Sequence, residues 1–205
     1  MRRSISFILV WLFLGLYAAA ACAAPRILVF GDSLSAGYGL AAGEGWVTLL
    51  QQRLEREAYP HEVINASVSG ETSSGGLARL PAVLDQRKPE IVLIELGGND
   101  GLRGLPAKNL RENLEAMVAL VRKKGAQPVL FEMRIPPNYG PLYAGQFRAA
   151  FGEAAKSGKT ALVPFFLTAI ADKPGLFQED GIHPVAAAQA QMLDAVWPTL
   201  KPLLH

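Results

Sequence analysis

Short apolar runs alternate with longer segments of helical periodicity along most of this chain, and this alternation restricts the possible folds more than any other feature. Five runs rich in Val, Ile and Leu predict strands: Arg26–Phe30, His61–Asn65, Glu90–Leu96, Gln127–Phe131 and Thr160–Val163. The other periodic segments predict helices: Gly45–Glu57, Thr72–Arg87, Pro106–Lys124, Gly145–Lys156 and Val185–Leu200. Strands joined by helices of this length pair in parallel through right-handed crossovers. We therefore expect a three-layer α/β/α fold with helices on both faces of a five-stranded parallel sheet.

A sheet of this kind binds its ligand beyond the carboxyl ends of the strands, where the strand order reverses. With the flavodoxin-like order 2-1-3-4-5, that point lies between the first and third strands. The loop Gly31–Ser35 follows the first strand, Asn65–Gly76 follows the second and Gly97–Asp100 follows the third. These loops should face one crevice. The long irregular stretches Arg134–Ala144 and Thr168–Pro184 are further candidates for functional loops.

The beginning of the chain has the pattern of a bacterial secretory signal. Two arginines precede the apolar run Ile5–Leu16, and a small-residue stretch then ends at Pro25. We expect cleavage after Ala23 to remove residues 1–23, leaving residues 24–205 as one domain in the periplasm or outside the cell. A permanent membrane anchor is an alternative, but the run falls short of the ~20 apolar residues that span a bilayer.

Composition narrows the classes of function. Cys22 is the single cysteine, so the cleaved chain has neither a disulfide nor a cysteine nucleophile, unless Cys22 is instead lipidated as the first residue of a lipoprotein. Cleavage also removes two arginines and cancels the formal charge of +2, and no basic run exceeds Arg122-Lys123-Lys124, so no nucleic-acid partner is expected. Metal-ligand spacings, Walker loops and dinucleotide fingerprints are absent from the sequence. We expect a monomer that acts on a small molecule without a cofactor or metal.

Ser33 is a candidate nucleophile, but its motif is ambiguous. The esterase elbow Gly-x-Ser-x-Gly has a glycine where this chain has Ser35, so Ser33 could instead be a helix cap. The neighbouring Asp32 side chain should point to the opposite face, which suggests a residue that braces the loop by hydrogen bonds. A serine hydroxyl needs a base to act as a nucleophile, and in hydrolases that base is usually a histidine oriented by a carboxylate.

Of the three histidines, His183 is best placed to be that base. His61 opens the second strand at the amino edge of the sheet, and His205 is the terminal residue. His183 ends the long loop before the last helix, and Pro184 favours an extended conformation at His183 and suits the first turn of that helix. Asp180 lies three residues earlier and could orient the imidazole. The alternative is that Asp180 and His183 only cap the helix.

Acyl transfer also needs donors aimed at the oxygen that becomes negative. Asn99 offers a side-chain amide after the third strand, Gly70 a backbone N–H after the second, and Ser33 its own N–H. Each segment could also be a simple turn by composition. Their shared position at one sheet edge favours an oxyanion hole.

These segments resemble, in order and spacing, the four sequence blocks of the GDSL or SGNH hydrolases. The blocks are Gly31–Ser35, Gly70 within Val68–Thr72, Gly97–Asp100 and Asp180–Pro184. The chain is most similar to the periplasmic arylesterase group that includes thioesterase I and lysophospholipase L1, because it carries the segments "ELGGNDGLRG" and "PPNYG". The resemblance implies the SGNH hydrolase fold over residues 24–205.

For the site, the resemblance implies a triad of Ser33, Asp180 and His183, with Ser33, Gly70 and Asn99 forming the oxyanion hole. It also implies a serine esterase that acts on aryl esters, fatty-acyl esters and thioesters, or lysophospholipids. Apolar residues at the crevice-edge loops could hold the acyl group, although they could equally be local packing. The candidates are Leu102, Pro137, Tyr139 and Ile182, with Leu105, Ile135, Pro136, Leu142 and Tyr143 nearby.

Two other functions remain open from the sequence. A carbohydrate acetyl esterase could use the same scaffold, although more polar loops would then be expected. A flavodoxin-like module could bind FMN or another phosphate ligand without catalysis, using the glycine and hydroxyl loops to hold the phosphate.

Overall fold

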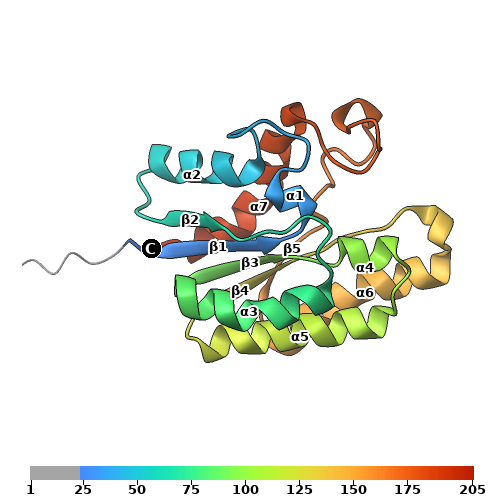
Figure 1. Cartoon of the computed structure of the whole chain (residues 1–205), viewed down its shortest axis with the longest axis horizontal. Coiled ribbons are helices and arrows are strands. Elements are labelled where there is room, and N and C mark those ends of the chain that lie inside the picture. The colour runs from blue at the N-terminus through green and yellow to red at the C-terminus, as the bar shows by residue number, and fades with distance from the viewer. Residues whose placement is uncertain (1–23) are drawn as a thin grey trace, which may run out of the picture.

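A five-stranded parallel sheet forms the centre of the molecule, which we describe from a computed structural model over residues 24–205 (Figure 1). The strands are β1 (Arg26–Gly31), β2 (Glu62–Asn65), β3 (Ile91–Glu95), β4 (Gln127–Phe131) and β5 (Ala161–Val163), in the order β2-β1-β3-β4-β5. The predicted fold class and strand order are confirmed. The predictions of a signal segment, its cleavage and lipidation at Cys22 concern residues outside the described part.

The sheet is buried on both faces, as expected for parallel strands that read as continuous apolar runs. Every residue of β3 is buried, including Glu95 at its carboxyl end. In the pairing of β1 with β3, Gly31 lies opposite Glu95, so the two strands end side by side. The loops after them therefore start at neighbouring points of the same sheet edge.

Helices cover both faces (Figure 1). The helices α2 (Trp46–Arg56) and α7 (Gln189–Leu200) pack on one face, and α3 (Ser73–Arg87), α5 (Ala107–Lys123) and α6 (Pro141–Gly158) pack on the other. Helices α2 and α7 are joined by a hydrogen bond from the backbone N–H of Trp46 to Gln189 Oε1, at 3.0 Å. Two short helices, α1 (Ser33–Ala36) and α4 (Gly98–Leu102), lie at the carboxyl edge. Within residues 24–205, no helix combines the length and apolarity needed to cross a bilayer.

Several boundaries differ from the sequence prediction. Helix α6 begins at Pro141, within the stretch predicted to be irregular, because proline suits the first helical position and Gly140 supplies a φ of 85° before it. A 3₁₀ turn, Pro137–Tyr139, precedes it. The last helix starts as a 3₁₀ turn, Ala186–Ala188, before α7. The Gly97–Asp100 segment runs into helix α4 and does not form a simple turn.

Candidate active site

Ser33 is the first residue of helix α1, directly after strand β1 and the capping residue Asp32. The Oδ1 atom of Asp32 accepts the Leu34 N–H at 3.1 Å, as an N-cap does. The strand reaches this turn through Gly31, where a Cβ atom would lie 2.6 Å from Glu95 Oε2 and 2.8 Å from Ser35 Oγ. Glycine is therefore required for the close approach of β1 to these two side chains. Ser33 begins a helix, as the cap interpretation held, but Asp32 supplies the capping oxygen.

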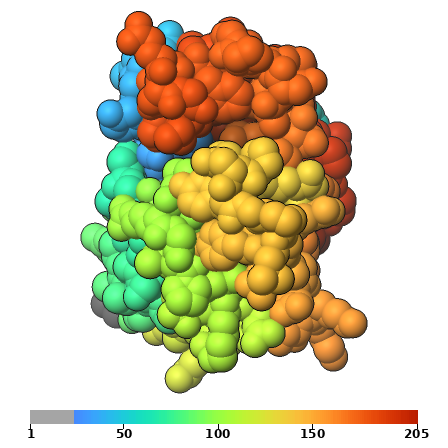
Figure 2. Space-filling view, turned by 90° about the vertical axis from the view of Figure 1, so that its right-hand side faces the viewer, coloured from blue at the N-terminus to red at the C-terminus, as the bar shows by residue number. Residues whose placement is uncertain are grey.

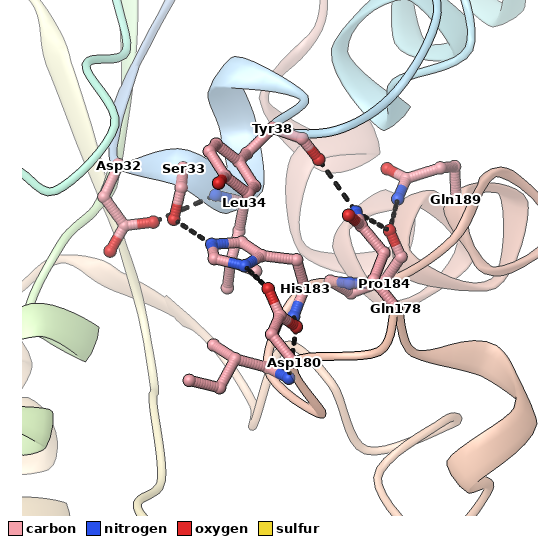
Figure 3. A network of polar contacts seen from close by, with 10 residues as sticks. Asp32, Ser33, Leu34, Tyr38, Gln178, Asp180, His183, Pro184 and Gln189 are labelled. Carbon is pink, nitrogen blue, oxygen red and sulfur yellow. Dashed lines mark hydrogen bonds and ion pairs between the residues drawn. The ribbon is translucent and has the colours of Figure 1, made fainter.

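His183 lies between Ser33 and Asp180, with one ring nitrogen facing each (Figure 3). Its Nε2 atom is 2.8 Å from Ser33 Oγ, and its Nδ1 atom is 2.6 Å from Asp180 Oδ2. The other carboxyl oxygen of Asp180 accepts the backbone N–H groups of Ile182 and His183, at 2.8 and 2.9 Å. Asp180 therefore caps its own turn and contacts the imidazole at the same time.

These bonds also fix the charge of Asp180. The His183 backbone N–H, followed by the His183 ring and the Ile182 N–H, lowers the pKa of Asp180 from 3.8 to about 2. Asp180 is thus ionised throughout the range in which an imidazole titrates. An ionised carboxylate at Nδ1 favours the tautomer in which Nε2 can accept the Ser33 proton.

The loop that carries His183 is held from two sides. Phe177 and Pro184 form an isolated antiparallel bridge, and the Gln178 N–H donates to the His183 carbonyl at 2.7 Å. Gln178 Nε2 donates to the Tyr38 carbonyl at 2.8 Å, which joins this loop to the loop after α1 (Figure 3). The Tyr38 ring lies against the His183 ring, with 4.4 Å between centroids. Tyr38 was not predicted as a site residue, because an aromatic side chain between two glycines carries no signal of its partner.

The three predicted oxyanion donors come from three separate segments: Ser33 from helix α1, Asn99 from helix α4 and Gly70 from the loop after β2. Asn99, in α4, donates through Nδ2 to Asp32 Oδ2 at 3.0 Å, which leaves its second amide hydrogen for a ligand. Gly70 has a φ of 78°, a conformation that favours glycine, and its carbonyl accepts from Arg103 Nη2 at 2.9 Å. Among residues 24–205, neither the Ser33 N–H nor the Gly70 N–H has an acceptor.

A pocket of about 290 Å³ opens beside Ser33 and His183. Asp32, Gly98 and Asn99 line it on the polar side. The rest is largely apolar and includes Leu34, Leu102, Met133, Pro136, Leu167, Phe177 and Ile182. Figure 2 views the molecule from this edge, with the segment around residues 170–184 above and the segments near 100–110 and 135–150 below.

The predicted acyl-contacting residues divide into two groups. Leu102 and Ile182 line the pocket, whereas Pro137 and Tyr139 are not among its lining residues. The Tyr139 hydroxyl donates to the Leu102 carbonyl at 2.8 Å, so Tyr139 contacts a residue of the pocket wall.

Two buried acids, Asp32 and Glu95, lie next to each other at the site, and of the two only Asp32 lines the pocket. Asp32 was predicted to be a bracing residue, and its bonds to Leu34 and Asn99 confirm that interpretation. Glu95 was not singled out, although an acid at the end of an otherwise apolar run was a usable signal. Burial raises the pKa of Asp32 to about 6, and complete burial, followed by the charge of Asp32, raises the pKa of Glu95 well above its usual range.

The other two histidines lie away from the pocket. His61 is buried directly before β2, and His205 ends the chain. Within the described residues, no group of three or more His, Cys, Asp or Glu side chains could hold a metal ion.

Comparison with known proteins gives consistent matches. Residues 29–191 match the model of the GDSL-like Lipase/Acylhydrolase family. The chain is 54% identical over 182 residues to Esterase TesA of Pseudomonas aeruginosa, covering 89% of this chain and 90% of that protein. It is 43% identical over 195 residues to thioesterase 1/protease 1/lysophospholipase L1 of Escherichia coli K12, covering 95% and 92%. A crystal structure of the psychrotrophic esterase EstA from Pseudoalteromonas sp., inhibited by monoethylphosphonate, superposes with a TM-score of 0.83 at 46% identity, covering 87% and 97%.

Proposed function

Because the chain belongs to the GDSL-like lipase/acylhydrolase family, we propose that it hydrolyses carboxylic esters and thioesters through an acyl-enzyme formed on Ser33. The single observation that carries this assignment is the 2.8 Å contact between His183 Nε2 and Ser33 Oγ at the wall of the apolar pocket. Helix capping does not require an imidazole oriented by a carboxylate, whereas activation of a serine nucleophile does.

In the first half of the reaction, Ser33 Oγ attacks the carbonyl carbon and gives its proton to His183 Nε2. The ionised Asp180 carboxylate holds the Nδ1 side of the ring and stabilises the imidazolium that forms. When the tetrahedral intermediate collapses, the alcohol or thiol leaves with the proton from His183. Water then repeats the same path on the acyl-enzyme, which releases the acid and restores Ser33.

The negative oxygen of the intermediate is held by the Ser33 N–H, the Gly70 N–H and the Asn99 amide. The two backbone groups have no acceptor within residues 24–205, and one Asn99 hydrogen is already fixed on Asp32. Donors that are oriented before the reaction need no reorganisation when the charge develops.

The pocket supports fatty-acyl and aryl esters and acyl thioesters as substrates. Its volume of about 290 Å³ and its largely apolar wall would bury an acyl chain, and hydrophobic burial contributes about 0.8 kcal/mol per CH₂ group. Relatives of this chain are named as an esterase, an arylesterase and a thioesterase/lysophospholipase, which supports the same range for this protein.

The test is a series of p-nitrophenyl esters from acetyl to dodecanoyl, with acyl-CoA thioesters and lysophospholipids measured alongside. We expect kcat/KM to rise with chain length until the pocket is filled and then to level off. Ser33→Ala should abolish turnover of every member. A higher rate on acetylated xylan than on the octanoyl ester would instead support a carbohydrate esterase.

The N-terminal pattern supports export to the periplasm or the medium. We also propose that the exported protein acts as a monomer. Mass spectrometry of the protein from the exporting cell should give a chain that begins at Ala24. A lipid-modified chain that begins at Cys22 would contradict cleavage after Ala23. The elution volume of the pure protein should correspond to one copy.

A further inference from the structure

Two acidic side chains, Asp32 and Glu95, lie next to each other beneath the Ser33 turn. Asp32 is 2% exposed and Glu95 is completely buried. None of the ion pairs within residues 24–205 includes either residue. Two ionised carboxylates at this depth would repel each other strongly, so the pair holds a proton.

The hydrogen bonds of the two carboxyls differ. Both oxygens of Asp32 accept an N–H group: Oδ1 that of Leu34 at 3.1 Å and Oδ2 that of Asn99 at 3.0 Å. Glu95 Oε2 contacts Ser35 Oγ at 2.6 Å and the Asp32 N–H at 3.4 Å, but Glu95 Oε1 has no partner within residues 24–205. A buried carboxylate with one oxygen unpartnered is costly, whereas a neutral carboxyl is less so. The negative charge therefore belongs on Asp32 and the proton on Glu95.

The surrounding charges act on Asp32 in opposite directions. Asp32 faces Glu95 from β3, Asp100 from α4 and His183 from the last loop. The charge of Asp100 raises the pKa of Asp32, whereas the charge of His183 and the hydrogen bonds from Leu34 and Asn99 lower it. Glu95 faces Asp32 as its charged neighbour. Burial raises the pKa of both acids, and that of Glu95 is raised well above its usual range.

We propose that Glu95 is a positioning residue that stays protonated, so that Asp32 remains the ionised acceptor that aims the Asn99 amide at the oxyanion. This inference rests on the proposed esterase function. Asp32 Oδ2 binds one hydrogen of the Asn99 Nδ2 group, and the planar amide then presents the other hydrogen to the pocket. A charged acceptor fixes that amide more firmly than a neutral one.

The kinetic test compares neutral replacements at both acids. Asp32→Asn should lower kcat about 10- to 100-fold with little change in KM, because a single carbonyl oxygen cannot accept both the Leu34 N–H and the Asn99 amide hydrogen. Glu95→Ala should also lower kcat, by about 10- to 100-fold, because the turn above it shifts. Glu95→Gln is neutral and of the same shape as a protonated Glu95. It should retain most of the kcat that Glu95→Ala loses, and the acid limb of its pH–rate profile should match that of wild type. If Glu95→Gln loses as much as Glu95→Ala, or Asp32→Asn keeps the wild-type kcat, the proposal is wrong.

A spectroscopic test needs no catalysis and no variant that must fold. In wild-type protein with isotope-labelled glutamate carboxyl carbons, NMR should show one carboxyl that keeps the chemical shift of a protonated acid at neutral pH. If every glutamate carboxyl is ionised at neutral pH, the proposal is overturned even if the protein is an active esterase. If the protonated signal is present but no ester is hydrolysed, the proposed function fails while the protonation of Glu95 stands.

Discussion

The Nε2 atom of His183 lies 2.8 Å from the Oγ atom of Ser33, although 150 positions separate the two residues in the chain. Ser33 is the first residue of helix α1, which follows the first strand, and His183 lies in the loop before α7. Asp180 holds the other ring nitrogen at 2.6 Å. The imidazole is therefore fixed on both sides, which is the arrangement that a general base needs.

Asn99→Ala should lower kcat by ~10²–10³, because it removes one oxyanion donor worth ~2.7–4 kcal/mol in the transition state. KM should change little, since the amide acts on charge that is absent from the ground state. Steady-state kinetics on the octanoyl ester measures both constants. Asn109→Ala, at an exposed position of α5, is the matched control and should behave as wild type. Unchanged turnover in Asn99→Ala would remove Asn99 from the mechanism.

Tyr38→Ala should reduce kcat by about 2- to 10-fold, the range expected from loss of one aromatic pair. The Tyr38 ring lies 4.4 Å from the His183 ring and can stabilise the imidazolium, although Tyr38 is 53% exposed. Tyr38→Phe keeps the ring and should retain wild-type kcat. Equal losses in the two variants would show that the ring contact does not matter.

Asp180→Asn should destabilise the protein in a pH-dependent way. Bonds to His183 and Ile182 lower the pKa of Asp180 from 3.8 to about 2 in the folded state. Its contribution to stability is therefore fully present above the ordinary pKa and is lost as the pH falls through about 2. Denaturant unfolding should give a larger difference between wild type and variant near neutral pH than near pH 3. A difference independent of pH would contradict the assignment.

Asp180→Asn should also lower kcat/KM by roughly 10²–10⁴-fold, because an amide no longer enforces the required tautomer of His183. The control is Glu179→Gln, which changes the exposed acid next to Asp180. It should leave both stability and activity as in wild type. Loss of activity in Glu179→Gln comparable to that in Asp180→Asn would mean that general loop charge matters, and not the contact with His183.

Ile182→Ala should lower kcat/KM for the octanoyl ester by about 3- to 30-fold, because part of the acyl chain loses its apolar contact. The acetyl ester should be affected little, since its chain is too short to reach this wall. Leu142→Ala is the control: Leu142 is 76% exposed and does not line the pocket, whereas Ile182 is 44% exposed and does. Similar losses in the two variants would place the acyl chain elsewhere.

The sheet was predictable because its strands are buried on both faces. Runs such as Ile91–Glu95 keep their apolar character through every position but the last, and their spacing leaves room for one helix each. Boundaries near proline and glycine were less predictable. The start of α6 was not predicted, because the residues of the Pro136–Gly140 segment suit both a loop and the beginning of a helix. Helix α4 was not predicted either, because Gly97 and Gly98 are typical of a turn.

The contacts of the site were predictable only in part. The spacing of Asp180 and His183 and the position of Ser33 follow from the chain, and the structure brings all three into contact. The bond from Asn99 to Asp32 and the burial of Glu95 depend on how two strand ends lie side by side. No local pattern encodes such pairings, since they join residues far apart in sequence.

Labelling with a fluorophosphonate probe, followed by peptide mass spectrometry, tests most directly whether Ser33 is the nucleophile. Wild-type protein should carry the probe on Ser33, and Ser33→Ala should carry none. Ser69→Ala, at an exposed serine of the loop after β2, should be labelled as wild type is. A wild-type protein that is not labelled, is labelled at another residue, or contains bound yellow flavin would contradict the account.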